Sequence, residues 1–187
     1  MRRLGLLGGT FDPPHYGHLL AAQEAAWQLE LERVLFLPAR QNPLKRGERM
    51  TDADVRCELV QAAIADNPRF ELSRLDLDRP PPSYTVDLLR SMQRADHALF
   101  FIAGGDIMRE LPRWHAVDEI LRLATIVVVT RPGAQLEATQ HSLRTLQIPG
   151  VDVSSTQLRE RVRQGQPIKY LTPPAVERLI LERRLYV

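Results

Sequence analysis

Apolar and polar residues follow two patterns that alternate along the chain. Short runs such as Leu4–Leu7 and Thr125–Thr130 are almost continuously apolar, whereas the apolar residues of the longer segment Tyr16–Leu29 are spaced at helical intervals. A continuous apolar run indicates a strand that is buried on both faces, and helical spacing indicates a helix with one face on the core. The alternation predicts an α/β fold, a Rossmann-like doubly wound parallel sheet with helices on both faces.

The same patterns, together with proline, glycine and capping residues, give the expected order of elements. Thr51–Asp54 matches a helix capping box, and Ser154–Thr156 matches the start of a helix whose end is marked by Gly165. The stretch 134–150 could hold a short helix, a strand near Leu146–Ile148, or neither. The expected strands are Leu4–Leu7, Arg33–Pro38, Phe70–Ser73, His97–Ala103, Thr125–Thr130 and Val151–Val153, and the expected helices are about Tyr16–Leu29, Thr51–Asp66, Thr85–Arg94, Ile107–Leu111, His115–Leu123, Ser154–Gln164 and a terminal helix from Thr172.

The composition indicates a globular protein that acts on small molecules. The chain has 187 residues, of which 44% are hydrophobic and 26% charged, so a single domain over residues 1–187 is expected. The formal net charge is only +2 and no run of like charges occurs, which argues against a nucleic-acid partner. Cys57 is the only cysteine, which excludes an intrachain disulfide and a thiolate metal cluster. No signal peptide or membrane span is apparent, so a cytoplasmic protein without membrane attachment is expected.

The most informative chemical pattern directly follows the first expected strand. Gly8–Phe11 forms a glycine-containing turn, two prolines follow, and His15 and His18 lie where the first helix begins. A strand, a glycine turn and a helix in this order place backbone N–H groups and a helix N-terminus against a phosphate group. The three-residue spacing lets both imidazoles face the same anion. Neither a Walker-type loop nor a dinucleotide-binding glycine fingerprint occurs, so the pattern predicts a different kind of phosphate site.

Glycine or polar residues also follow two later strands of the predicted sheet. Gly104 comes directly after Ala103, and Ser154–Thr156 come directly after Val153. Ligands of parallel α/β sheets bind at the carboxyl ends of strands, beside the change in strand order. Three strand ends are therefore expected to meet at one cleft, with Ser154–Thr156 at a helix N-terminus that favours phosphate.

The turn and the histidine pair, within Gly8–Leu19, resemble the signature of the HxGH nucleotidyltransferases. Ser83–Asp87 is similar to the Ser-Tyr-Thr-x-Asp segment of the bacterial nicotinate-nucleotide adenylyltransferases, and the resemblance spans nearly the full length. One departure lies in Asn42–Lys45, where Leu44 replaces the histidine that the family usually has and leaves Lys45 as the only cation. The other matching segments are Gly105-Asp106 with Leu111 and Trp114, Arg131–Gly133, Ser154–Thr156 with Arg159, and Tyr170-Leu171.

The resemblance implies an adenylyl transfer in NAD biosynthesis, in which ATP and nicotinate mononucleotide give deamido-NAD and pyrophosphate. A phosphate oxygen of the mononucleotide would attack the α-phosphorus of ATP in line, without a covalent enzyme intermediate, so alignment and charge stabilisation are the main requirements. His15 and His18 would donate hydrogen bonds to the ATP phosphates, and Lys45 would supply positive charge. Mg²⁺ would be held mainly by the ATP phosphates and water, since the sequence shows no spacing typical of a protein metal cage.

Two groups of binding residues follow from the resemblance. Trp114 is expected to stack on the pyridine ring, although a tryptophan between two helical segments would by itself be assigned to the core. Backbone N–H groups near Thr85 and His115 are expected to bind the nicotinate carboxylate, with Tyr84 beside them. The expected ATP site comprises Gly8, Gly9, Thr10, Phe11, His15, His18, Gly104, Asp106, Arg131, Ser154, Ser155, Thr156 and Arg159.

Two other kinds of function stay open. The acceptor could be nicotinamide mononucleotide or phosphopantetheine, although the phosphopantetheine branch typically has threonine at the position of His15. A non-catalytic module that senses nucleotides or binds RNA is the non-enzyme alternative, but the chain lacks the basic stripe with interleaved aromatic residues that RNA binding favours. The expected partners are therefore small molecules, and both a monomer and a homodimer are compatible with the sequence.

Overall fold

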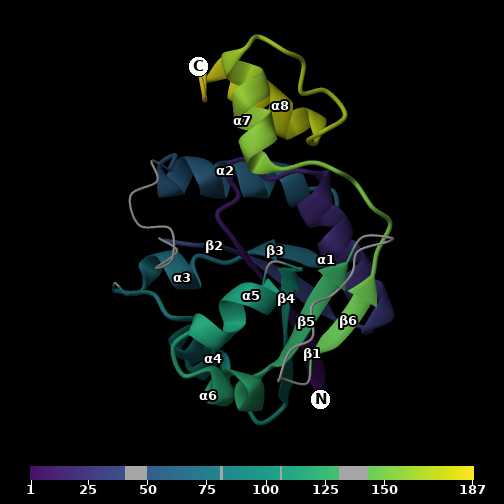
Figure 1. The fold of residues 1–187 in the computed structure, drawn as a ribbon, viewed down its shortest axis with the longest axis vertical. Coiled ribbons are helices and arrows are strands. Elements are labelled where there is room, and N and C mark those ends of the chain that lie inside the picture. Colours follow the sequence, from purple (N-terminus) through teal and green to yellow (C-terminus); the bar gives the residue numbers. More distant parts are fainter. Residues whose placement is uncertain (41–49, 81, 106, 131–142) are drawn as a thin grey trace.

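The computed structural model describes residues 1–40, 50–80, 82–105, 107–130 and 143–187. Within these residues six strands form one parallel sheet in the order β3-β2-β1-β4-β5-β6 (Figure 1). The strands are β1 (Arg2–Gly9), β2 (Arg33–Pro38), β3 (Phe70–Leu72), β4 (His97–Gly104), β5 (Thr125–Thr130) and β6 (Arg144–Gln147). The helices are α1 (Tyr16–Gln28), α2 (Ala53–Ile64), α3 (Leu75–Asp78), α4 (Thr85–Met92), α5 (Ile107–Glu110), the 3-10 helix η1 (Leu111–Arg113), α6 (Val117–Leu123), α7 (Ser155–Arg163) and α8 (Pro174–Glu182).

The strand order reverses at β1, which confirms the predicted doubly wound sheet. β1 lies between β2 and β4, so that Leu6 pairs with Leu35 on one side and with Phe101 on the other. The chain winds outward from β1 to β3, returns to the centre, and winds outward again from β4 to β6. In such sheets the carboxyl ends of the two central strands border a crevice that binds ligands.

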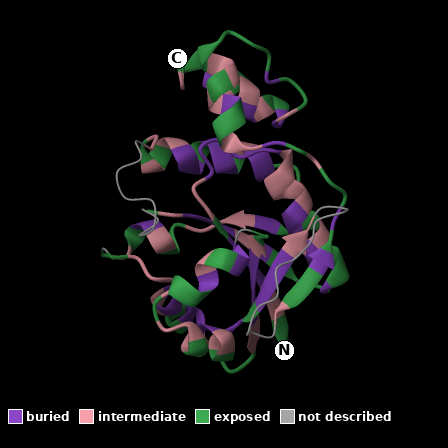
Figure 2. Cartoon of the chain, viewed as in Figure 1, coloured by how far each residue is buried: buried purple, intermediate pink, exposed green. Residues whose placement is uncertain are grey.

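Helices cover both faces of the sheet and bury two apolar clusters. Leu7 belongs to the cluster packed under α1 and α2, whereas its neighbour Leu6 belongs to the cluster under α4 and α6. Successive residues of a strand point to opposite faces, so a strand between two helix layers needs apolar residues at nearly every position. Figure 2 shows the buried residues concentrated in the strands and in the helix faces that lie against them. This arrangement explains the continuous apolar runs of the sequence.

The C-terminal helices α7 and α8 lie at one end of the molecule, beyond α2 (Figure 1). Leu158 of α7 and both Val176 and Ile180 of α8 belong to the same apolar cluster as α1 and α2. Among the described residues, no helix combines the length and the apolar character that crossing a membrane would need. The single domain over residues 1–187 stays a prediction.

One predicted strand is wrong. Val151–Val153 does not form a strand, and the last strand is β6, which falls in the stretch that the sequence left ambiguous. Val153 is apolar because it is buried beside Gly17 at the start of α1. The segment carries the chain from β6 across to α7 (Figure 1). Burial alone therefore produced the strand-like pattern.

Two smaller differences concern the start of α2 and the short helix α3. The cap of α2 is Asp52, whose carboxylate accepts a hydrogen bond from the Asp54 N–H at 2.8 Å, so Thr51 is not the capping residue. The one-turn helix α3, which buries Leu77, lies where the sequence predicted no element. Four residues are too few to show a helical period, which is why the pattern missed it.

Candidate active site

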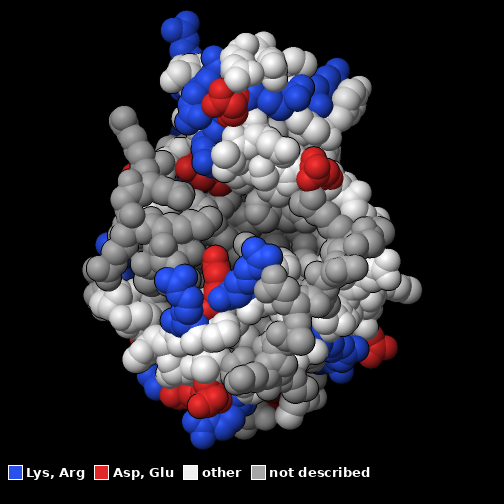
Figure 3. Space-filling model, viewed as in Figure 1, with Lys and Arg blue, Asp and Glu red and all other residues white. Residues whose placement is uncertain are grey.

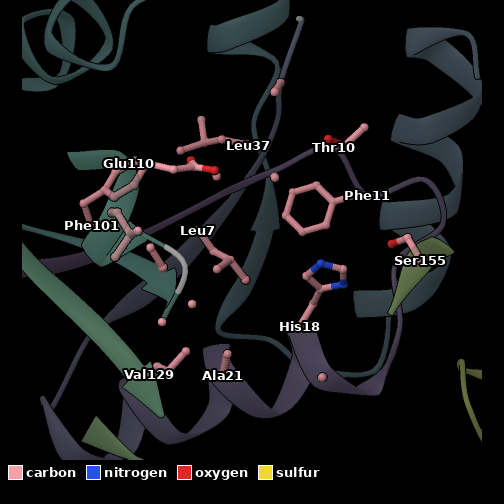
Figure 4. A pocket seen from close by; sticks show the side chains of 18 of the residues that line it. Leu7, Thr10, Phe11, His18, Ala21, Leu37, Phe101, Glu110, Val129 and Ser155 are labelled. Atoms are coloured by element: carbon pink, nitrogen blue, oxygen red, sulfur yellow. The ribbon is translucent and has the colours of Figure 1, made fainter. Parts of the chain in front are cut away.

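A cleft of about 1030 Å³ opens at the carboxyl ends of β1 and β4 and extends to the N-terminus of α7. Figure 3 shows this face of the molecule hollowed at its centre, with basic and acidic side chains on the rim, and Figure 4 shows side chains that line the cleft. Three candidate residues, Lys45, Asp106 and Arg131, lie outside the described residues. The structure brings all the others together in the lining: Gly8, Gly9, Thr10, Phe11, His15, His18, Tyr84, Thr85, Gly104, Trp114, His115, Ser154, Ser155, Thr156 and Arg159.

Backbone N–H groups at the start of α1 fix both histidine rings. Nδ1 of His15 accepts a hydrogen bond from the Gly17 N–H at 3.1 Å, and Nδ1 of His18 accepts one from the His15 N–H at 3.2 Å. Because each Nδ1 is an acceptor, each neutral ring carries its proton on Nε2. The rings stack with their centroids 3.8 Å apart, and both residues line the cleft. The pair therefore offers two N–H donors to one ligand.

The surroundings of the pair decide its charge. His15 is buried. The pKa of His18 lies well below its ordinary value, because loss of solvent around the His18 ring disfavours its charged form and the neighbouring His15 disfavours a second positive charge. The rings of Phe11 and His18 meet edge to face, with 5.0 Å between their centroids (Figure 4). His18 is therefore neutral at pH 7 and meets an anion as a hydrogen-bond donor rather than as a cation.

Gly17, between the two histidines, allows a close approach of the His15 ring. A Cβ atom added to Gly17 would lie 3.0 Å from both Nδ1 and Cε1 of that ring. The Gly17 N–H is also the donor that fixes His15 Nδ1. The absence of a side chain therefore keeps the ring in its hydrogen-bonded position.

We expect Gly17→Ala to displace the His15 ring and to lower kcat by about tenfold, because a small misplacement of a catalytic group is costly. Gly to Ala within a helix normally stabilises the helix by about 1 kcal/mol, so the fold should survive the change. Steady-state kinetics and thermal unfolding of the same preparation test both statements. A kcat equal to that of the wild type would show that the position of the His15 ring does not matter.

The turn after β1 brings the Phe11 ring over Gly9. Phe11 has a left-handed backbone conformation with φ of 52° and is 1% exposed. A Cβ atom on Gly9 would lie 3.1 Å from the Phe11 ring, so any larger residue would push the ring away. Gly8, Gly9 and Thr10 line the cleft, where backbone N–H groups can approach a phosphate.

The N-terminus of α7 forms another wall of the cleft. Ser154 caps the helix with its hydroxyl oxygen. The Ser155 hydroxyl donates to the Pro13 carbonyl at 2.8 Å, and the Arg159 guanidinium donates to the Asp12 carbonyl at 2.8 Å. These two bonds fix α7 against the loop that follows the glycine turn. The Ser154 cap takes the Gln157 N–H, which leaves the N–H groups of Ser155 and Thr156 without an acceptor inside the helix, so this wall favours an anion.

The cleft lining also contains the residues predicted for the pyridine ring, Tyr84, Thr85, Trp114 and His115. The rings of Tyr84 and His115 lie 4.6 Å apart, and Trp114 meets Phe101 edge-on at 5.6 Å between ring centroids. α4 begins at Thr85 and has no side-chain cap. Uncapped helical N–H groups beside aromatic rings suit a flat ring that carries a carboxylate.

Sequence reasoning missed Asp76 and Arg79, which hold this part of the cleft together with Ser83 of the matched segment Ser83–Asp87. Asp76 accepts a hydrogen bond from the Arg79 guanidinium at 2.8 Å and another from the Ser83 hydroxyl, and Arg79 also donates to the Tyr84 carbonyl at 3.1 Å. The network ties α3 to the segment before α4 and so holds Tyr84 in place. Asp76 and Arg79 lie in or directly after the four-residue helix α3, where no periodic pattern marks them.

Sequence reasoning also missed Arg56 and Tyr186, whose side chains donate hydrogen bonds to the loop between β1 and α1. Arg56 is 1% exposed and donates to the Thr10 carbonyl at 2.7 Å. Tyr186 donates its hydroxyl hydrogen to the Asp12 carboxylate at 2.6 Å. The one available signal was an arginine among the apolar residues of the helix that became α2.

Comparisons with known proteins agree with this geometry. A family model described as cytidylyltransferase-like matches residues 6–161. The chain is 42% identical to a probable nicotinate-nucleotide adenylyltransferase of Bacillus pumilus, over 100% of this chain and 99% of that protein. It is 46% identical to the protein of the same name from Roseiflexus sp., over 98% and 97% of the two chains.

Solved structures share the fold at lower sequence identity. A putative nicotinate-nucleotide adenylyltransferase from Vibrio parahaemolyticus aligns with a TM-score of 0.72 at 23% identity, covering 100% of this chain and 96% of that one. The nicotinic acid mononucleotide adenylyltransferase of Plasmodium falciparum, in complex with NaAD, aligns with a TM-score of 0.80 at 16% identity, covering 100% and 98%. By sequence identity over its full length, the chain belongs to the nicotinate-nucleotide adenylyltransferase family of the cytidylyltransferase-like proteins.

Proposed function

We propose that this protein transfers the adenylyl group of ATP to nicotinate mononucleotide, giving deamido-NAD and pyrophosphate in NAD biosynthesis. Relatives that are 42% and 46% identical over almost the whole chain carry the corresponding name. The observation that carries the proposal is the stacked pair of His15 and His18 beside the glycine turn, in which His18 Nδ1 accepts from the His15 N–H and His15 Nδ1 accepts from the Gly17 N–H. It provides two fixed donors where a triphosphate can lie.

The reaction needs alignment more than a protein nucleophile. A phosphate oxygen of the mononucleotide attacks the α-phosphorus of ATP, the bond to the β-phosphate breaks, and pyrophosphate leaves in line with the incoming oxygen. One end of the cleft, at the glycine turn and α7, holds ATP, and the end near Trp114 holds the mononucleotide. Their phosphates then meet between the two ends.

His15 and His18 stabilise the charge that builds on the phosphate oxygens. Both rings present Nε2–H donors whose direction is fixed by the hydrogen bonds at Nδ1. Preorganised donors in a site shielded from water cost no reorganisation when the charge develops. His18 is neutral at pH 7, so Arg159 and Lys45 supply the positive charge at the phosphates.

Magnesium enters as part of the MgATP substrate and helps to neutralise the phosphates. Among the described residues, no group of three or more His, Cys, Asp and Glu side chains could hold a metal ion. Three described carboxylates line the cleft. Asp12 accepts hydrogen bonds from Tyr186 and Thr51, Asp76 accepts them from Arg79 and Ser83, and Glu110 belongs to no cluster of metal-binding side chains. The described donor set therefore suits a metal held by phosphate and water.

Preference for the acid mononucleotide rests on the uncapped start of α4. A nicotinate carboxylate can accept from the first N–H groups at Thr85, whereas the amide of nicotinamide would place an NH₂ donor against donors. Trp114 supplies an aromatic face for the pyridine ring. His115 lies across from Tyr84 at the same end.

A product assay tests the function. The purified protein with ATP and MgCl₂ is expected to release pyrophosphate and form the dinucleotide from nicotinate mononucleotide. Nicotinamide mononucleotide is expected to react at least about tenfold more slowly, because a lost or repulsive hydrogen bond is worth 1–3 kcal/mol. Excess EDTA should abolish product formation. Phosphopantetheine serves as the third acceptor.

Each contrary outcome points to one alternative. If nicotinamide mononucleotide or phosphopantetheine gave product faster than nicotinate mononucleotide, that compound would be the acceptor, and the adenylyl transfer itself would stand. Binding of ATP without product from any of the three acceptors would favour a nucleotide-sensing protein.

A further inference from the structure

Side chains from distant parts of the chain donate hydrogen bonds to four of the six carbonyls in the loop between β1 and α1. This loop, residues 10–15, lies next to the N-terminus of α7 in space although 140 or more residues separate them in sequence. The donors are, in order along the loop, Arg56 to the Thr10 carbonyl at 2.7 Å, Arg159 to the Asp12 carbonyl at 2.8 Å, Ser155 to the Pro13 carbonyl at 2.8 Å and Thr172 to the Pro14 carbonyl at 2.7 Å.

The Asp12 side chain is the central contact of this arrangement. Asp12 is 3% exposed; one carboxylate oxygen accepts from the Tyr186 hydroxyl at 2.6 Å, and the other accepts from the Thr51 N–H at 3.0 Å. Burial and the bond to Asp12 raise the pKa of the Tyr186 hydroxyl, which therefore stays protonated and donates. A hydrogen bond from a neutral donor to a buried carboxylate is among the stronger kinds.

The C-terminal segment makes a second contact with the same loop. Thr172 is 1% exposed and its hydroxyl bonds the Pro14 carbonyl, while the neighbouring Leu171 carbonyl accepts from the Tyr16 N–H at 3.3 Å. His15 lies between Pro14 and Tyr16. Its backbone is therefore held on both sides by residues that follow α7.

We propose that Tyr186 and Thr172 are positioning residues, which fix the loop that carries His15 against the N-terminus of α7. This inference rests on the proposed adenylyl transfer. The glycine turn with its histidines and the N-terminus of α7 come from opposite ends of the chain, yet both must touch one triphosphate. Ser155 and Arg159 join the loop to α7, while Tyr186 and Thr172 hold the loop itself and lie outside the cleft lining.

The test compares three variants that each remove one hydroxyl group or replace it by a methyl group. In Tyr186→Phe and Thr172→Val we expect kcat to fall by about tenfold while KM for the mononucleotide stays within twofold, since the far end of the cleft is untouched. Tyr170→Phe is the control, because Tyr170 is 80% exposed and lies outside the cleft lining. Its kcat should equal that of the wild type.

A purely structural role would give a different result. It would lower the midpoint of thermal unfolding but leave kcat at 25 °C unchanged, because the folded fraction would still be close to one. A kcat within twofold of the wild type in both Tyr186→Phe and Thr172→Val would overturn the inference.

A readout without substrate separates this inference from the proposed function. The imidazole ¹⁵N signals of His15 and His18 in the free protein are expected to shift in Tyr186→Phe and not in Tyr170→Phe. If the wild type formed no dinucleotide, the proposed function would fail, and these signals would still decide whether Tyr186 positions the histidines. Unchanged signals would count against it.

Discussion

Replacing His18 by alanine is expected to lower kcat by about 10²–10³-fold, the usual loss when one preorganised donor to a developing charge is removed. The change removes the Nε2–H donor and also the acceptor that holds the His15 N–H. KM for the mononucleotide should change little, because the pyridine end of the cleft is untouched. Initial rates at saturating ATP and mononucleotide measure the effect.

His97→Ala is the matched control for this experiment. His97 begins β4, at the end of the strand opposite to the cleft. The same chemical change there should leave kcat as it is. His18→Asn, which keeps an N–H donor on a shorter side chain, should retain more activity than His18→Ala. Full activity of His18→Ala would remove the histidine from the mechanism.

Replacing Trp114 by alanine is expected to raise KM for nicotinate mononucleotide by about tenfold or more, since stacking of an aromatic side chain on a base is worth 1–3 kcal/mol. KM for ATP should change by less than threefold, because Trp114 is assigned to the pyridine ring of the mononucleotide and not to ATP. Separate titrations of the two substrates give both constants.

Two further variants separate stacking from packing. Trp114 also meets Phe101 edge-on, so Trp114→Phe, which keeps an aromatic face and most of this contact, should restore much of the affinity. Trp27→Ala is the control, because Trp27 is 73% exposed on α1 and outside the cleft lining. A larger rise in KM for ATP than for the mononucleotide would place the Trp114 ring at the adenosine instead.

The sequence by itself predicted the α/β architecture and the part of the site that the glycine turn and the two histidines form. β1, β2, β4 and β5 were predicted because a strand covered by helices on both faces is apolar at nearly every position, and that burial is written locally in the chain. The glycine turn and the spacing of His15 and His18 were equally local. Backbone conformation and a three-residue spacing follow from neighbouring residues, so they could be recognised before the fold was known.

Tertiary structure alone decided which distant polar groups meet. The bond from Tyr186 to Asp12 joins residues 174 positions apart, and the bond from Arg159 to the Asp12 carbonyl joins residues 147 apart. Val153 is likewise buried against a residue that is distant in sequence, Gly17 at the start of α1, and this burial gave it the apolar pattern of a strand. Hydrophobic spacing records how deeply a residue is buried and does not record its partner. The partner is fixed only when the helices pack on the sheet, which brings the two ends of the chain to one phosphate site.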